Sequence, residues 1–167
     1  RIASSSNFGN ICSVAASSIF LPFLPATAAQ LLLLNLCYDA TCLALSWDNV
    51  DDAEIARPKA WSGKGLGSFM LHFGFASSAF DIITFAILFL GVCPAVCGGP
   101  FAALDATGQA TFIATFQAGW LLECAWTESL VLLILRARSV RDGDRPCRPL
   151  VMMVAAMLVA SALLALS

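Results

Sequence analysis

The chain has 167 residues, of which 59% are hydrophobic and only 12% are charged, and its mean hydropathy is +0.84. A soluble domain carries about 25% charged residues, so this composition excludes an ordinary soluble fold and indicates a membrane protein. The formal net charge is -2, and no basic face interleaved with aromatic residues suggests a nucleic-acid partner.

Five apolar segments follow one another along the chain, and each approaches the roughly 20 residues that cross the hydrocarbon of a bilayer as a helix. The sequence therefore predicts an all-α membrane protein with one domain over residues 1–167, a bundle of five transmembrane helices in contact with the lipid bilayer. The predicted helices cover residues 2–24, 26–45, 68–92, 111–135 and 150–167. Because the chain opens on Arg1 and closes inside an apolar run, we expect it to be truncated at both ends.

The first two predicted helices carry the polar residues of greatest interest. A proline-bounded turn at residues 22–25 predicts an antiparallel hairpin. Asn7 and Asn10 are three residues apart, and Asn35 and Asp39 are four apart, so each pair shares a helix face. If the two faces meet, their oxygens suit a hard cation such as magnesium or calcium. Asparagines also join membrane helices by hydrogen bonds, but a carboxylate at membrane depth favours an ion or proton site.

The distribution of basic residues predicts a topology. All nine Lys and Arg residues lie at the amino end or in two alternate loops, residues 46–67 and 136–149, and none lies in the loop at 91–110. The positive-inside rule then places the amino end and both basic loops in the cytosol. The acidic run at residues 48–54 lacks the central Gly and final Glu of an EF-hand, so we interpret it as a solvated loop.

Three more acids, Asp81, Glu123 and Glu128, lie in the third and fourth predicted helices. No Lys or Arg lies in a membrane segment to neutralise them, so each either carries a proton or binds a cation. Glu123 lies deep enough to be a ligand or a proton carrier. Asp81 and Glu128 have the alternative of hydrogen bonding to neighbouring helices.

Tryptophans and cysteines give weaker signals. Trp47, Trp61 and Trp120 are candidates for anchoring helix ends at the membrane interface. Cys93 and Cys97 share the predicted loop at 91–110, where a disulfide and two free thiols are both open, and their spacing is not that of a zinc site.

Several short motifs together resemble those of the magnesium-transporting P-type ATPases. The motifs are Ser5-Ser-Asn-Phe-Gly-Asn10, Leu21-Pro-Phe-Leu-Pro25, Asn35-Leu-Cys-Tyr-Asp39, Asp48-Asn-Val-Asp51 and Phe116-Gln-Ala-Gly-Trp120. Their order and spacing match the carboxy-terminal membrane domain of that family, from the fifth helix into the ninth. The resemblance covers essentially the whole chain, and the combination is specific although each motif alone is weak.

The resemblance implies ATP-driven movement of magnesium through a membrane site. By motif, Asn7 and Asn10 match polar positions of the family's fifth helix, while Asn35 and Asp39 match cation-binding positions of the sixth. Glu123 falls where related sequences often have an acid in the eighth helix. The predicted set of metal ligands is therefore these five residues.

The resemblance also implies a division of labour within a longer protein. The phosphorylation motif Asp-Lys-Thr-Gly-Thr and the actuator motif Thr-Gly-Glu-Ser are absent from this chain, so it alone has no catalytic residue. ATP would bind only to cytosolic domains outside this chain, and the loop at 46–67 would contact the phosphorylation domain. The sequence departs from the family at Ser46, where Pro is frequent, and at Glu128, where Gln is commoner.

Two alternatives stay open. The same fold can transport another cation, such as calcium or protons, because oxygen ligands alone do not fix selectivity. In the other alternative the chain is a noncatalytic membrane scaffold, and its polar residues only join helices.

Overall fold

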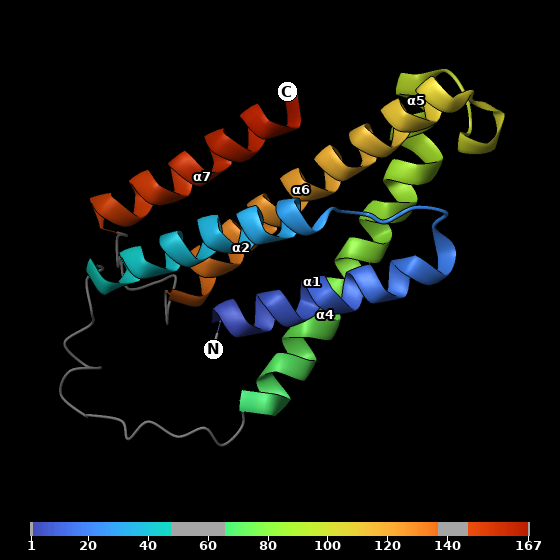
Figure 1. Cartoon of the computed structure of the whole chain (residues 1–167). Helices are drawn as coiled ribbons and strands as arrows, with labels where there is room; N and C mark the ends of the chain where they lie inside the picture. The colour runs from blue at the N-terminus through green and yellow to red at the C-terminus, as the bar shows by residue number, and fades with distance from the viewer. Residues whose placement is uncertain (1, 48–65, 137–146, 167) are drawn as a thin grey trace.

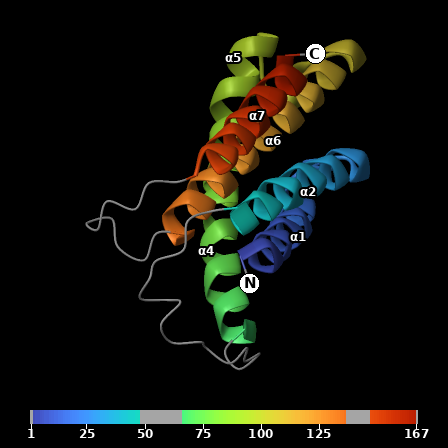
Figure 2. The ribbon, with the colours of Figure 1, turned by 90° about the vertical axis from the view of Figure 1, so that its left-hand side faces the viewer.

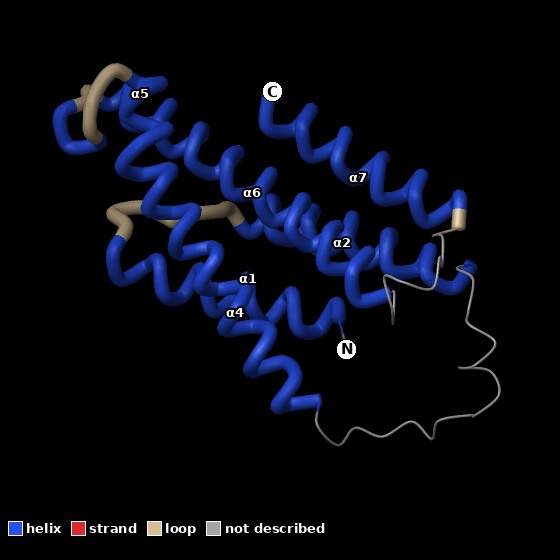
Figure 3. The backbone as a smooth tube through the Cα atoms, turned by 180° about the vertical axis from the view of Figure 1, so that it is seen from behind, coloured by secondary structure: helices blue, strands red, loops and turns tan. Residues whose placement is uncertain are grey.

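The computed structural model describes residues 2–47, 66–136 and 147–166. Within these ranges the chain forms five long helices and no strand, so the prediction of an all-α bundle is confirmed (Figure 3). The predicted contact of the 46–67 loop with another domain falls largely outside the described residues. The long helices are α1 (Ile2–Phe20), α2 (Ala28–Leu43), α4 (Leu66–Ile87), α6 (Ala106–Arg136) and α7 (Arg148–Leu166).

The connection between α1 and α2 follows from its prolines and from a helix cap. α1 ends at Phe20, before Pro22, because proline cannot continue a helix. Thr27 caps the start of α2: its side chain accepts a hydrogen bond from the Gln30 backbone, and the Gln30 side chain accepts one from the Thr27 backbone. α2 passes directly into a short 3-10 helix, η1 (Ala44–Trp47).

The predicted loop at 91–110 is largely helical, which corrects the sequence-based boundary. After α4 the chain continues as a π-helical turn, η2 (Leu88–Val92), and then as α5 (Cys93–Cys97). Pro94 stands in the first turn of α5 directly after this π-helical turn, where the regular i→i−4 hydrogen-bond pattern is already interrupted. Gly98 ends α5 with a φ of 81°, and the 3-10 helix η3 (Phe101–Ala103) leads towards α6. Cys93 and Cys97 are both free.

The helices are arranged around α6. α1 packs chiefly on α4, which it crosses, whereas α6 packs against α2, α4 and α7 (Figures 1 and 2). α7 also contacts α2 and η1, so the carboxy-terminal helix closes one side of the bundle. A polar group on α1 is therefore positioned through α4, and through any side chain that reaches across to α6.

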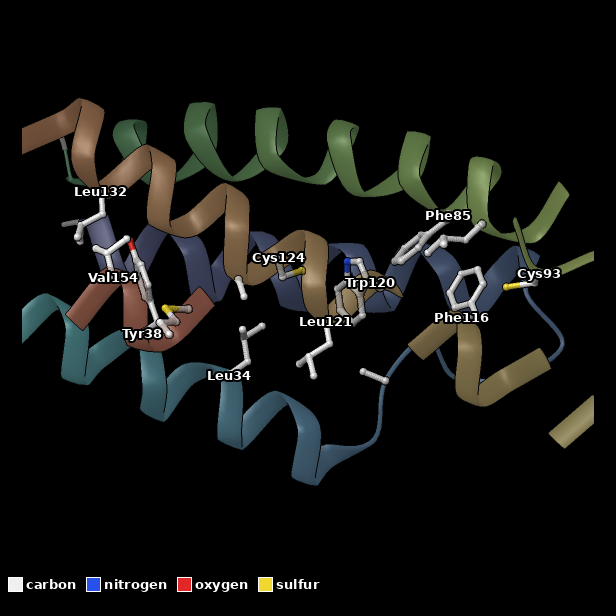
Figure 4. Packing of buried hydrophobic residues seen from close by; sticks show 14 of the residues in the cluster. Leu34, Tyr38, Phe85, Cys93, Phe116, Trp120, Leu121, Cys124, Leu132 and Val154 are labelled. Atoms are coloured by element: carbon white, nitrogen blue, oxygen red, sulfur yellow. The ribbon is translucent and has the colours of Figure 1, made fainter. Parts of the chain in front are cut away.

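Aromatic side chains fill the core along α6 (Figure 4). Phe85 of α4 stacks on Phe116, with ring centroids 5.5 Å apart, and meets Trp120 edge-on at 5.3 Å. Phe23, from the proline turn, lies 5.2 Å from Phe116 and 5.3 Å from Phe101. Each such pair contributes about 0.5–1.5 kcal/mol beyond its buried area, so the turn is held against Phe101 and the first half of α6.

The outer surface of the bundle is strongly apolar. Ile19, Leu90 and Met152 are 78%, 76% and 70% exposed, which suits contact with lipid rather than water. Among the described residues, the stretch Met70–Ala103 is long and apolar enough to cross a membrane, whereas Ala28–Leu43 and Arg148–Leu163 are apolar but shorter. The apolar character of α1 is diluted by serines and by its two asparagines.

Candidate functional site

On α2, Asn35 and Asp39 lie one turn apart and have different surroundings. Asp39 is exposed, while Asn35 is partly buried and its Oδ1 is a buried acceptor without a hydrogen-bond partner. Leu34 and Tyr38, by contrast, are buried against α6 and α7 (Figure 4). Asp39 therefore lies away from the aromatic core, on a surface that the described helices leave open.

On α1, the two asparagines make different contacts. The Oδ1 atom of Asn7 is buried and has no hydrogen-bond partner. Asn10 is only 4% exposed, and its Nδ2 donates a hydrogen bond to Oε1 of Glu128, on α6, over 3.0 Å. The alternative that Glu128 hydrogen-bonds a neighbouring helix is thus confirmed. The amide of Asn10 is fixed by α6, which leaves its Oδ1 as the oxygen available for other ligands.

Asp81, on α4, is the centre of a buried polar network. Its Oδ1 accepts a hydrogen bond from Nε1 of Trp120 over 3.1 Å, and Sγ of Cys124 lies 3.9 Å from the same oxygen. Its Oδ2 accepts a hydrogen bond from Oγ of Ser13, on α1. Asp81 thus joins three helices, which agrees with the alternative that it hydrogen-bonds its neighbours.

Trp120 corrects one sequence-based expectation. It is only 1% exposed and donates its indole N–H inside the bundle, so it does not anchor a helix end at the membrane interface. Trp47 is 68% exposed, in agreement with an interfacial position. Trp61 lies outside the described residues.

Glu123, the fifth predicted ligand, is partly buried beside the same network. Oxygen atoms of Asp81 and Glu123 and the sulfur of Cys124 all lie within 4.8 Å of one another. Sγ of Cys124 is 3.9 Å from Oε2 of Glu123. Two carboxylates and a thiol are a softer donor set than magnesium prefers. The contacts of Glu123 thus link it to α4, and its convergence with Asn35 and Asp39 stays a prediction.

Ser13 was missed in the sequence, although a signal for it exists. Asn10, Ser13 and Ser17 follow one another at spacings of three and four residues, which places them on one face of α1. All three are buried, with exposures of 4%, 0% and 4%. A polar stripe at this spacing in an apolar helix predicts a buried interface.

The fold and these polar contacts define a helical membrane domain, and comparison with known families identifies its class. The family model of the carboxy-terminal region of cation-transporting ATPases matches residues 23–167. The chain belongs to this family, so the resemblance to the carboxy-terminal membrane domain of a P-type ATPase is confirmed.

Particular relatives lie within that family. The chain is 40% identical over 140 residues to "Magnesium-transporting ATPase, P-type 1" of Salmonella typhimurium strain LT2. It is 39% identical over 140 residues to the protein of the same name from Escherichia coli strain K12. Each match covers 84% of this chain but only 14% of the relative.

Proposed function

We propose that this chain is the ion-translocating membrane domain of an ATP-driven magnesium transporter. The cation is coordinated by polar residues of α1 and α2, namely Asn7, Asn10, Asn35 and Asp39, and Glu123 of α6 contributes a further carboxylate. The observation that carries the proposal is the pair of buried carboxamide oxygens on Asn7 and Asn35 that have no hydrogen-bond donor. The names of the relatives support magnesium as the ion.

Unpaired buried oxygens are costly, and a cation removes that cost. A buried acceptor without a partner costs about 1–3 kcal/mol, and the hydrocarbon of a bilayer supplies no water to replace the missing donor. Magnesium is bound by oxygen atoms and retains several waters of its own. Two carboxamide oxygens and one carboxylate are therefore a chemically suitable set. Asp39 supplies a negative charge for the cation. No Lys or Arg in residues 2–47 neutralises that charge.

The orientation of Asn10 supports the same set. Because its Nδ2 donates to Glu128, its Oδ1 is the atom left for coordination. Asn7 is three residues earlier on α1, and the two side chains lie on neighbouring parts of one helix face. Glu123, beside Asp81, acts in this proposal as a ligand or a proton carrier further along the path.

The proposal extends to the longer protein and to its topology. Cytosolic domains of that protein bind ATP and carry the phosphorylated aspartate, and the loop at 46–67 contacts the phosphorylation domain. The amino end and the loops at 46–67 and 136–149 face the cytosol. A reporter fused after Gly99 is therefore expected on the opposite side of the membrane. A cytosolic reporter at that point overturns the topology.

The test is magnesium uptake by the full-length protein in a bacterial host that lacks its own uptake systems. Asp39→Ala and Asn10→Ala are expected to reduce uptake and ion-stimulated phosphorylation strongly. Asp105→Ala is the matched control, because Asp105 is an exposed acid whose carboxylate accepts a hydrogen bond at the start of α6, from Gly108. Normal uptake by both site variants overturns the site. The same assay with calcium, and at different pH values, separates magnesium from the alternative cations.

A further inference from the structure

α1 approaches α4 unusually closely. A Cβ atom built on Gly74 would lie 2.7 Å from Cδ1 of Phe8, and one built on Gly9 would lie 3.1 Å from Cβ of Ser77. The missing side chains thus let the two helix backbones come together, as small residues do in membrane bundles. The residues that bracket Gly9 on α1 are the proposed ligands.

Hydroxyl groups add hydrogen bonds to this seam, the close contact of α1 with α4 at Gly9 and Gly74. Oγ of Ser78, on α4, donates to the carbonyl oxygen of Gly9 over 3.2 Å, and Oγ of Ser13 lies 3.0 Å from the same oxygen. Asp81 stands three residues after Ser78, on the same face of α4, and contacts the other side of the Ser13 hydroxyl. A single buried carboxylate therefore closes the seam between α1 and α4.

The same carboxylate connects the seam to α6. The indole N–H of Trp120 donates a hydrogen bond to Oδ1 of Asp81. All three side chains of this network are buried: Asp81, Ser13 and Trp120 are 3%, 0% and 1% exposed. In a bilayer no hydrophobic force holds two apolar helices together, so packing of small residues and interhelical hydrogen bonds decide how they sit. The rotation of α1 about its own axis therefore depends on the contacts of Asp81.

We propose that Asp81 is a positioning residue that fixes α1 against α4 and α6, so that Asn7 and Asn10 present their oxygens to the transported cation. In this role Asp81 acts through Ser13 and Trp120, each of which donates a hydrogen bond to one of its oxygens, and not as one of the five proposed ligands. This inference rests on the proposed function. It assigns a role to an acid that lies outside the predicted ligand set.

Two substitutions separate positioning from cation binding. In Asp81→Asn, Oδ1 still accepts from Trp120, and the new N–H donates to the Ser13 hydroxyl, which accepts as well as donates. In Asp81→Leu both contacts are lost at similar volume. Asp81→Asn is expected to keep the magnesium concentration for half-maximal uptake near that of the wild type. Asp81→Leu is expected to raise it about tenfold with little change in maximal rate, as weakened ground-state binding does.

Ser13→Ala tests the same joint from the α1 side. It removes the hydroxyl that Asp81 contacts and is expected to shift magnesium dependence in the direction of Asp81→Leu. Ser18→Ala is the matched control, because the exposed hydroxyl of Ser18 donates to the Val14 carbonyl of its own helix. An Asp81→Asn variant as impaired as Asp81→Leu shows that the charge itself is needed, and this overturns the proposal. An unchanged magnesium dependence in Asp81→Leu overturns it equally.

A measurement without the cation keeps this inference distinct from the proposed function. Hydrogen exchange of the α1 amides is compared among the wild-type full-length protein, Asp81→Asn and Asp81→Leu in the absence of magnesium. Faster exchange in Asp81→Leu alone is expected, since only that variant releases α1. Equal exchange in all three overturns the positioning role whatever the uptake assay shows. Failure of the wild type to transport magnesium overturns the proposed function, while the exchange result still decides whether Asp81 holds α1.

Discussion

The side-chain amide of Asn10 donates a 3.0 Å hydrogen bond to the carboxylate of Glu128, which lies 118 positions further along the chain. The bond joins α1 to α6, and it gives the Asn10 carboxamide a single orientation. Both residues are buried, at 4% and 7% exposure, so the bond is not weakened by competing water. A polar residue of the first long helix is thus held by the fourth.

Substitution of Glu128 tests this bond. Glu128→Gln retains an acceptor oxygen for Asn10 and is expected to unfold near the wild-type temperature. Glu128→Leu leaves the buried amide without its acceptor and is expected to cost about 1–2 kcal/mol. Thermal unfolding of the full-length protein in detergent measures both. If Glu128→Gln is as destabilised as Glu128→Leu, the charge of Glu128 matters more than the hydrogen bond.

The helices were predictable because each apolar segment approaches the length that a bilayer requires, and because prolines mark the first turn. The helix boundary at residue 92 was not predictable, since Pro94 looks like a helix breaker in the sequence, whereas the helix continues past it after a π-helical turn. Similarly, helical spacing predicts that Asn7 and Asn10 share a face of α1. Spacing along one helix does not say which neighbour that face meets.

The partners of Asp81 likewise could not be predicted from spacing along one helix. The sequence identifies Asp81 as an uncompensated acid and leaves ion contact and helix contact both open. Its partners Ser13 and Trp120 lie 68 and 39 positions away, and only the packing of α1, α4 and α6 brings them together. The interface prediction for Trp120 is wrong because tryptophan is common at membrane interfaces, and only burial distinguishes an anchor from a buried donor.

The close approach of α1 and α4 makes Gly74 sensitive to a single methyl group. Gly74→Ala places a Cβ 2.7 Å from the ring of Phe8, and the strain is expected to lower the stability by about 1–3 kcal/mol. Gly67→Ala is the matched control on the same helix, because no described atom lies within 4 Å of the added Cβ. Thermal unfolding of both variants gives the comparison. Equal stability of the two contradicts the close contact between α1 and α4.

A hydrogen bond, besides the packing of Phe23, ties the Pro22–Pro25 turn to α6. Nε2 of Gln117 donates a 3.0 Å hydrogen bond to the carbonyl oxygen of Leu24. Gln117→Leu is expected to cost about 0.5–1.5 kcal/mol and to speed amide exchange in the turn. Thr111→Ala is its control, because the exposed Thr111 hydroxyl donates within α6, to Thr107. Unchanged exchange at the turn in Gln117→Leu shows that the aromatic cluster around Phe23 holds it without this bond.

The unpaired oxygen of Asn35 predicts opposite effects on stability and on cation binding. In the absence of magnesium, Asn35→Leu removes a buried acceptor without a partner and is expected to leave the unfolding temperature unchanged or to raise it. In saturating magnesium the wild type gains stability from the bound ion, about 2.7 kcal/mol at a concentration 100 times the dissociation constant. The variant is expected to gain much less.

Gln30→Leu is the matched control for Asn35→Leu, because Gln30 is a carboxamide on the same helix whose contacts are those of the Thr27 cap. It removes the Gln30 side-chain half of the capping box and is expected to lower the unfolding temperature equally with and without magnesium, since the cap lies outside the proposed ligand set. If Asn35→Leu lowers stability in the absence of magnesium by as much as Gln30→Leu does, the Asn35 oxygen has a partner within the protein. If its gain from magnesium equals that of the wild type, Asn35 is not a ligand, and the cation is held without the carboxamide of α2.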